Sequence, residues 1–332
     1  MSLKTFSRFL AFPIVACGGQ CWWMVHYAPT NTIASAVWIP LLTFAWYCIG
    51  GLSHEIAHGN LKINRTLGSV ISRLIGSVLG IPCTVYREVH MRHHAYLNTP
   101  LDWEMWPYSD PDASLRFRRI FVWFDIVFAI VVTPIAWGRI CFSSKSPVSE
   151  DIRRRMRREY WGVAVFWFGA IGTGIWFHQT GRFLFEWEHL IFAVPPVVAT
   201  MCNGFRKIMD HVGTSSFDPL HGTRTVVGGN IITKALTWFN FDLAIHGPHH
   251  RYPKLDHAQL KGRMSEITDA NPDQTFPVFK SFLSAIFDTF RTAIRNPGVG
   301  LNAGCTADLS HLPSRQPAET PPATSVSGGS VS

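Results

Sequence analysis

Residues 9–51, FLAFPIVACGGQCWWMVHYAPTNTIASAVWIPLLTFAWYCIGG, contain no Asp, Glu, Lys or Arg. A membrane-spanning helix needs about 20 consecutive apolar residues, so this stretch is long enough for two spans, at residues 9–28 and 33–51. The residues between them, Pro29 to Thr32, are typical of a tight turn. We therefore predict that the chain begins with an antiparallel hairpin of two transmembrane helices.

The composition also favours a membrane protein. Only 16% of the 332 residues are charged and 47% are hydrophobic, whereas a soluble domain carries about 25% charge. This argues against an ordinary soluble enzyme and against disorder of most of the chain. The net charge of +8 suits an anionic membrane surface better than nucleic acid in so apolar a chain. The seven cysteines form no CxxC pair, so we interpret them as buried thiols.

The first residues allow a second interpretation. Lys4 and Arg8, followed by an apolar run that ends at Cys17, resemble a signal peptide or a lipoprotein site. However, the hydrophobic sequence continues far beyond any cleavage point, and no polar exported domain follows it. The hairpin is therefore the preferred interpretation.

Three more apolar stretches, at residues 120–138, 161–178 and 184–204, decide the topology. Positively charged residues stay on the cytosolic side, so Lys4 and Arg8 place the N-terminus there. The basic run from Arg153 to Arg158, which could also be a nucleic-acid patch, should then be cytosolic as well. An even number of crossings must separate it from the first hairpin.

We therefore predict that residues 120–138, which contain Asp125 and Pro134, lie in the interface or fold back on themselves. Residues 161–178 and 184–204 form a second hairpin, and both termini are cytosolic. Apolar residues between 279 and 294 recur every three or four positions, which predicts an amphipathic helix on the membrane or on a cytosolic domain. Residues 1–296 form the membrane domain, and residues 297–332, rich in Gly, Ser, Pro, Ala and Thr, form a disordered tail.

Eight of the 15 histidines fall into three short groups. On a helix, positions i, i+3 and i+4 share a face, so each group can direct its imidazoles to one point. In the predicted topology all three groups lie on the cytosolic side. The groups are HxxxH at His54 and His58, HxxHH at His90, His93 and His94, and HxxHH at His246, His249 and His250.

Eight neutral nitrogen donors are too many for one metal ion and suit two. Imidazole binds iron, zinc and copper; a redox role excludes zinc, and no thiolate or thioether motif indicates copper, so we favour two irons. The first group also matches HExxH, in which Glu55 would be the general base of a membrane zinc protease. That alternative does not explain the two HxxHH groups. Six of the remaining seven histidines (His26, His178, His189, His221, His257 and His311) are interpreted as core or surface residues.

The three histidine boxes, placed around two membrane hairpins, resemble those of the membrane fatty acid desaturase and hydroxylase superfamily over residues 10–255. The resemblance implies an all-α integral membrane fold with about four transmembrane helices and a cytosolic helical cap. The cap would hold two irons that use molecular oxygen. The resemblance also implies a ninth histidine ligand, His211, whereas an Asn ligand of some relatives is not matched because position 207 is Lys.

The resemblance narrows the reaction only in part. The third box begins with His246 rather than Gln, and the sequence has no HPGG motif of a fused cytochrome b5 domain. Electrons would therefore come from a separate ferredoxin or cytochrome b5, drawn by charge to the basic cytosolic face. We expect an acyl-lipid desaturase, with a hydroxylase or ketolase of a fatty, carotenoid or sterol-like substrate as the alternative. Besides that substrate and electron donor, we expect membrane lipids as partners and no nucleic acid.

Carboxylates commonly hold ligand histidines in place through the ring nitrogen that does not bind the metal. Four acidic residues lie near the boxes and are candidates for that role, or else solvated charges: Glu55, Glu88, Asp210 and Asp242. The segment Asp102–Tyr108, DWEMWPY, follows the second box. Its aromatic residues could line a substrate entrance, but anchoring at the membrane interface is the preferred interpretation.

Overall fold

The computed structural model describes residues 32–60, 64–182 and 190–309, together with residues 11, 14, 16–19, 21 and 22. Most of the first predicted span, 9–28, lies outside the described residues. So do the first residues of the fourth predicted span, 184–204, and residues 310–332 of the predicted tail.

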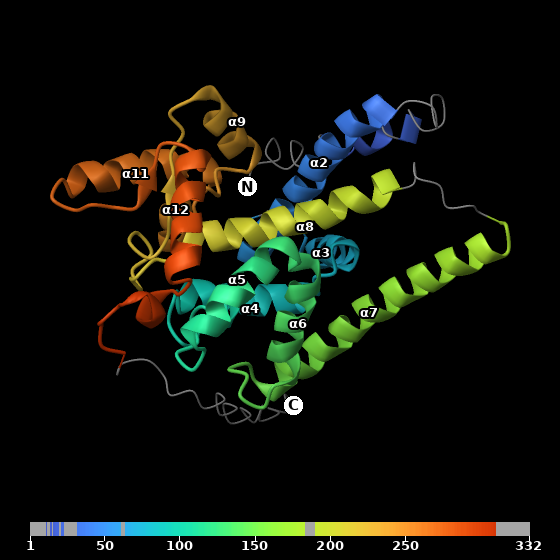
Figure 1. The fold of residues 1–332 in the computed structure, drawn as a ribbon, viewed down its shortest axis with the longest axis horizontal. Helices are drawn as coiled ribbons and strands as arrows, with labels where there is room; N and C mark the ends of the chain where they lie inside the picture. The colour runs from blue at the N-terminus through green and yellow to red at the C-terminus, as the bar shows by residue number, and fades with distance from the viewer. Residues whose placement is uncertain are drawn as a thin grey trace, which may run out of the picture.

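The described chain is mostly helical, and three long helices extend from a body of shorter ones (Figure 1). The long helices are α2 (Thr32–His58), α7 (Glu150–Gln179) and α8 (Leu190–His211). The shorter ones are α3 (Arg65–Leu79), α4 (Cys83–Ala95), α5 (Leu115–Val127), α6 (Ala129–Phe142), α9 (Ile231–Phe239), α10 (His246–Arg251), α11 (His257–Ala270) and α12 (Phe282–Arg295). Two 3-10 turns, η1 (Trp103–Met105) and η3 (Gly300–Ala303), and two short parallel strands, β1 (Thr225–Val226) and β2 (Val278–Phe279), complete it.

Among the described helices, α7 alone is long and apolar enough by itself to cross a membrane. It contains the predicted span 161–178, and its apolar part is not buried by the rest of the protein. Two bent helix pairs, α3 with α4 at 96° and α5 with α6 at 120°, reach the same criterion only if each pair is taken as one span. Four transmembrane helices in two hairpins therefore stay a prediction.

The stretch 120–138 turns back on itself, but not for the reason that the sequence indicates. The break between α5 and α6 lies at Phe128, whereas Pro134 is inside α6. Asp125 is 1% exposed, so it is not a charge held at a membrane surface. Its carboxylate accepts a hydrogen bond from Tyr108 Oη at 3.1 Å and pairs with Lys207 Nζ at 3.0 Å. Asp125 thus ties the bent pair to α8.

The amphipathic periodicity of residues 279–294 is realised as α12, which buries Ala285, Thr289 and Ala293. The predicted start of disorder at residue 297 is wrong. Val299 is fully buried, and its amide donates to the carbonyl of Tyr108 at 3.1 Å. Asn302 Nδ2 donates to the same carbonyl at 2.9 Å. The small and polar residues after α12 therefore form an ordered strap, here called the 298–305 strap, because their backbone groups find partners.

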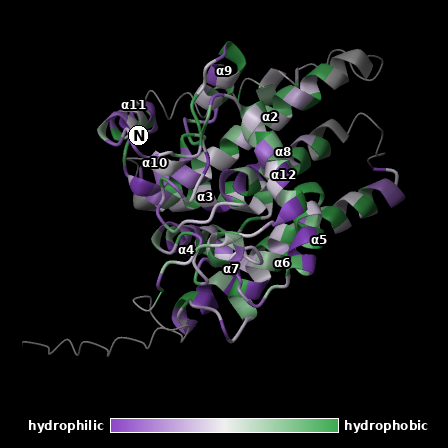
Figure 2. Cartoon of the chain, turned by 60° about the vertical axis from the view of Figure 1, so that its left-hand side comes forward, coloured by the Kyte–Doolittle hydropathy of each residue, from purple (hydrophilic) through white to green (hydrophobic). Residues whose placement is uncertain are grey.

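The region that holds the histidines lies where α2 and α8 end. These two helices pack along each other, and α4 contacts α2 beside them. Leu52 of α2 packs against Phe241 and Leu243, just before α10. Figure 2 shows hydrophobic residues along the projecting part of α2, whereas hydrophilic residues gather around α10 and α11. The histidines therefore sit at the junction between the apolar helices and the polar cap.

Candidate metal centre

The structure brings all nine predicted histidines together, from four helices, in two clusters. The five-histidine cluster consists of His54 and His58 of α2, His90 and His94 of α4, and His249 of α10. The four-histidine cluster consists of His93 of α4, His211 of α8, and His246 and His250 of α10. Within each cluster the nitrogen atoms lie within 4.8 Å of one another. The helical spacing in the sequence thus predicts the convergence, whereas the division into five and four comes from the tertiary packing.

Short distances between ring nitrogens show that each cluster surrounds a point. Nε2 of His211 lies 3.2 Å from Nε2 of His93 and 2.8 Å from Nε2 of His246. In the other cluster, Nε2 of His58 and Nε2 of His90 are 3.1 Å apart. Metal–imidazole bonds are about 2.0–2.1 Å, so two ligands at right angles on one ion lie about 3 Å apart. The spacing is therefore that of donors arranged around a cation.

Both α4 and α10 contribute to both clusters. His90 and His94 of α4 face one cluster, and His93 between them faces the other. On α10, His249 likewise belongs to the five-histidine cluster, whereas its neighbour His250 belongs to the four-histidine cluster. The rings of His94 and His250 stack across the boundary, with their centroids 4.0 Å apart and their planes 14° apart. Helices α4 and α10 and the stacked rings of His94 and His250 therefore join the two clusters.

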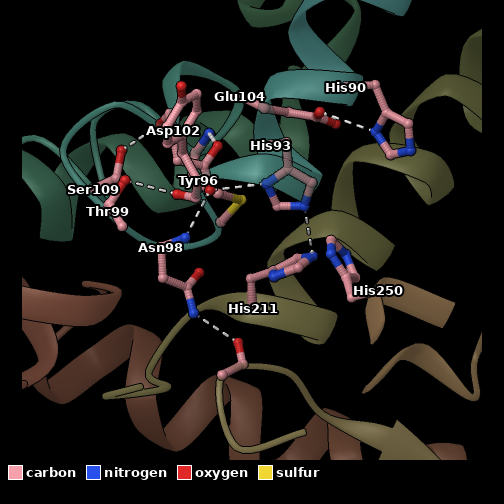
Figure 3. A network of polar contacts seen from close by, with 12 residues as sticks. His90, His93, Tyr96, Asn98, Thr99, Asp102, Glu104, Ser109, His211 and His250 are labelled. Carbon is pink, nitrogen blue, oxygen red and sulfur yellow. Dashed lines mark hydrogen bonds and ion pairs between the residues drawn. The ribbon is translucent and has the colours of Figure 1, made fainter. Parts of the chain in front are cut away.

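Carboxylates fix the orientation of three of the rings. Asp102 Oδ2 lies 2.8 Å from His93 Nδ1, Glu104 Oε2 lies 3.0 Å from His90 Nδ1, and Glu55 Oε1 lies 3.1 Å from His54 Nδ1. Figure 3 shows Asp102 and Glu104 on one side of the α4 histidines, with His211 and His250 on the other. A carboxylate that accepts the Nδ1 proton leaves the Nε2 lone pair free for a metal ion.

Of the four acidic residues that the sequence proposes for this role, Glu55 is a direct partner. Asp210 is 1% exposed, and its Oδ2 lies 3.7 Å from His246 Nδ1. Asp242 instead pairs with His257 at 3.1 Å, outside both clusters. Glu88 is half-buried on α4, and within the described part of the chain no hydrogen bond joins it to one of the nine histidines.

Sequence reasoning missed Asp102 and Glu104 as partners of the histidines. The segment that contains them was expected to anchor the protein at the membrane interface, and this is wrong for Tyr108. Tyr108 is fully buried, and the guanidinium of Arg139 lies over the rings of Trp103 and Trp106 at 4.4 and 4.5 Å. An acidic pair that follows a histidine box after one turn was the signal that could have identified the two carboxylates.

Burial makes most of the cluster histidines neutral donors. Burial, with the neighbouring His90 next in importance, lowers the pKa of His58 to about 3. The pKa of six others is lowered by burial first and by neighbouring charged groups second: His54, His94, His211, His246, His249 and His250. Neutral imidazole is the form that binds metal ions.

Several buried nitrogens have no hydrogen-bond partner, which tests whether a metal ion fits. Both ring nitrogens of His94 and Nε2 of His249 are buried and unpaired. An unsatisfied buried polar atom costs about 1–3 kcal/mol, and a metal ion in the five-histidine cluster would satisfy one nitrogen of each of these two rings. The two imidazole donor sets thus fit two metal ions, and the unpaired nitrogens add support for the ion in the five-histidine cluster.

A cavity of about 1630 Å³ extends from the clusters to the apolar helices. His54, His90 and His211 line it at the metal side. Trp103 and Trp106 also line it, as the alternative interpretation of their segment expected. Residues of α6 face it as well, among them Val132, Ala136, Trp137 and Ile140. The site can therefore receive a large and partly apolar substrate.

Lys207, at the position where some relatives were expected to have an Asn ligand, pairs with Asp125 rather than facing a cluster. Residues 31–281 of the 332-residue sequence match the family described as "Fatty acid desaturase". The matched region includes all nine clustered histidines and both newly found carboxylates. The resemblance inferred from the three histidine boxes is thereby confirmed, and this protein belongs to the fatty acid desaturase family.

Proposed function

We propose that the protein is an oxygen-dependent di-iron desaturase that introduces a double bond into an acyl chain. The observation that carries this proposal is the pair of imidazole clusters at the end of a cavity of about 1630 Å³. All nine clustered histidines would be ligands, five at one iron and four at the other. Family membership makes the protein an oxidoreductase; the metal, the reaction and the substrate are the proposal.

The choice of iron follows from the donor set. The two clusters consist of imidazole nitrogens only, and imidazole suits iron as well as zinc and copper. Zinc has no redox chemistry, and none of the free cysteines that the structure describes belongs to either cluster. Two bound irons would supply the oxygen chemistry that removes hydrogen from an unactivated C–H bond.

The chain itself contributes orientation and exclusion of water. Glu55, Asp102 and Glu104 hold three ligand rings through Nδ1, so that Nε2 stays aimed at the metal. Val132, Ala136 and Ile140 supply an apolar cavity wall for an acyl chain. A bound chain would displace water from the metal side and hold one carbon beside it.

We infer a multi-pass membrane location with both termini and the metal centre on the cytosolic side. The apolar helix α7 and the Arg153–Arg158 run at its start support this orientation. Electrons would come from a separate ferredoxin or cytochrome b5. Because the cytosolic face is basic, we expect the rate of reduction by an acidic carrier to fall as ionic strength rises. A rate that is independent of salt would contradict this part of the proposal.

The geometry does not support the HExxH protease alternative. Glu55 would have to face a metal-bound water as general base. Instead, its Oε1 contacts His54 Nδ1 at 3.1 Å, and its Oε2 accepts a hydrogen bond from Asn60 at 3.1 Å. Both carboxylate oxygens are therefore engaged away from Nε2 of the ligand rings.

Lipid profiling tests the proposal most directly. Lipids of cells that express the protein are compared by mass spectrometry with those of cells that express His249→Ala, with His221→Ala as a control outside both clusters. A lipid that is about 2 mass units lighter indicates desaturation, and a gain of about 16 indicates hydroxylation or the first step of a ketolase. Purified protein should contain iron and consume oxygen. Zinc content without oxygen consumption, or full turnover by His249→Ala, would overturn the proposal.

A further inference from the structure

Helix α12 has an apolar face that no described part of the protein covers. Its inner face, with Ala285, Thr289 and Ala293, is buried against the core. On the outer face Leu283 is 62% exposed, Phe287 66% and Ile294 62%. Most of the surface of these three large residues faces outward, and a cluster of exposed apolar residues commonly marks an interaction surface.

The exposed face of α12 continues onto α5. The ring of Phe290 stacks on that of Trp123 of α5, with centroids 6.0 Å apart and planes 10° apart. Ile120 and Phe124 of α5 are more than half exposed. The combined surface is here called the α5–α12 face, and it consists of Ile120, Trp123, Phe124, Leu283, Phe287 and Ile294.

The exposed charges at this face are mainly positive. Four arginines are exposed on the two helices: Arg116, Arg119, Arg291 and Arg295. The acidic residues of the same helices are occupied, because Asp125 is buried with Lys207 and Asp288 pairs with Arg224 at 2.7 Å. A surface of exposed aromatic and aliphatic residues with four exposed arginines around it matches an anionic lipid interface.

We propose that the α5–α12 face lies in the headgroup region of the cytosolic leaflet and binds anionic phospholipid through its arginines. The inference rests on the membrane location in the proposed function. Figure 1 shows α12 crossing the C-terminal end of α8, which is the cytosolic end in the proposed topology. Helix α12 would therefore lie along the membrane surface if α8 spans the membrane. The contact of Phe205 of α8 with Phe290, at 5.8 Å between centroids, fixes this crossing.

A second copy of the chain fits this face less well than lipid does. A symmetric dimer would place the same surface on both sides of the interface, so the four arginines of each copy would be brought together at one interface. Like charges brought together at an interface are unfavourable, whereas phosphate headgroups would neutralise them. Anionic lipid is therefore the occupant that the charges favour.

Photo-crosslinking of the full-length protein in cells tests the location. A photoreactive amino acid replaces Phe287 in one variant. In the control variant it replaces Glu266 of α11, whose side chain is 63% exposed. We expect the variant at position 287 to gain the mass of a phospholipid, and the variant at position 266 not to. Adducts with a protein at position 287, or equal lipid yield at the two positions, would overturn the inference.

The arginines are tested by the lipid that the purified protein retains. Arg291→Glu and Arg295→Glu are compared with Arg263→Glu on α11, and retained phosphatidylglycerol is measured relative to phosphatidylcholine. The backbone carbonyl of Arg295 would still accept from Arg119, so the helix contact is kept. One arginine near an anionic surface contributes about fivefold in affinity, so each reversal should lower the ratio by about that factor. An unchanged ratio would overturn the charge part of the inference.

These measurements do not depend on turnover, so the two proposals can fail separately. A phospholipid adduct at position 287 in a protein that leaves lipids unoxidised would refute the proposed function alone. Oxidised lipid together with a protein adduct at position 287 would refute the α5–α12 inference alone.

Discussion

Asp102 connects the metal centre to the turn that follows the second histidine box. Its side chain contacts His93 Nδ1 at 2.8 Å and accepts hydrogen bonds from the amides of Asn98 at 2.9 Å and Met105 at 3.3 Å. Asn98 has a φ of 60°, a left-handed conformation that Asn adopts more readily than most residues. This turn reverses the chain and places the carboxylate against its own box. The orientation of His93 therefore depends on a residue nine positions further along.

We expect Asp102→Asn to weaken metal binding while leaving the fold intact. The amide has nearly the shape of the carboxylate but is a weaker acceptor for the Nδ1 proton of His93. Loss of such an outer partner typically costs about 10–100-fold in metal affinity or activity. The measurement is iron retained against increasing chelator concentration, with the exposed Asp273→Asn as control. Equal retention in the two variants would contradict the role of Asp102.

For individual residues, local spacing in the sequence predicts which histidines converge, but it does not predict which carboxylates contact them. The i, i+3 and i+4 positions of His90, His93 and His94 are fixed by one helix, so their common face can be inferred from the sequence. The contact between Glu104 and His90 needs the turn at Asn98, which no periodicity reveals. The assignment of His93 to a different cluster from its neighbours depends on where α8 and α10 pack.

Among the elements, the bent pair of α5 and α6 depends on a buried ion pair. Asp125 is 1% exposed, and the side chain of its partner Lys207 is 26% exposed. The carboxylate also accepts a hydrogen bond from the hydroxyl group of Tyr108, which is fully buried. An apolar stretch alone could have been a straight span, so the bend was inferred from topology, and its position at Phe128 could not be.

We expect Lys207→Met to destabilise the protein because it leaves the Asp125 carboxylate buried with Tyr108 as its remaining partner. Removing one member of a buried pair costs about 3–5 kcal/mol, and the partial exposure of Lys207 places the cost at the low end, about 3 kcal/mol. The double variant Asp125→Leu with Lys207→Met should recover part of this loss. The measurement is the unfolding temperature in detergent. A single variant as stable as the wild type would show that the pair is unimportant.

The 298–305 strap is a second element that the sequence did not predict. Composition indicated disorder, but Val299 is buried and Asn302 donates to the carbonyls of Tyr108 and Asp110 at 2.9 and 2.8 Å. Composition describes average behaviour, whereas these contacts depend on the surface already built by residues 108–110. By contrast, α12 was predicted within a few residues, because its periodicity is local.

Two truncated chains test separately whether the 298–305 strap and the residues beyond it stabilise the protein. A chain that ends after residue 309 keeps all the strap contacts and should unfold at the same temperature as the full chain. A chain that ends after residue 296 loses the burial of Val299 and the two hydrogen bonds of Asn302, and it should unfold several degrees lower. Equal unfolding temperatures for the two truncations would contradict this role of the strap.

For the whole molecule, the metal-free protein contains an unusual concentration of buried neutral histidines. Seven of them have a pKa below the ordinary value of 6.5, mainly because they are buried, and that of His58 is lowered to about 3. Below pH 6.5 the unfolded chain binds protons at these positions, whereas the folded chain does not. Stability therefore falls as the pH falls through this range, because the unfolded state gains the protons.

We expect the metal-free protein to lose stability between pH 7 and pH 5, and the metal-loaded protein to be more stable at both values. An ion that binds only the folded state adds about 2.7 kcal/mol at 100 times its dissociation constant. The measurement is the unfolding temperature with and without chelator across this pH range. A metal-free protein that is equally stable at pH 7 and pH 5 would contradict the neutral, buried state of the histidines.

The helices that serve both clusters have a consequence for how the ions enter. An ion in the five-histidine cluster would immobilise α4 and α10 through His90, His94 and His249, and the same helices carry His93, His246 and His250 of the other cluster. Binding of the first ion therefore already orders the second site, and the second ion binds with a smaller loss of conformational entropy. Loading should thus be cooperative: at limiting iron, molecules with two ions and molecules with none should outnumber those with one. A shortage of iron would then reduce the number of complete enzymes rather than fill the population with half-loaded ones.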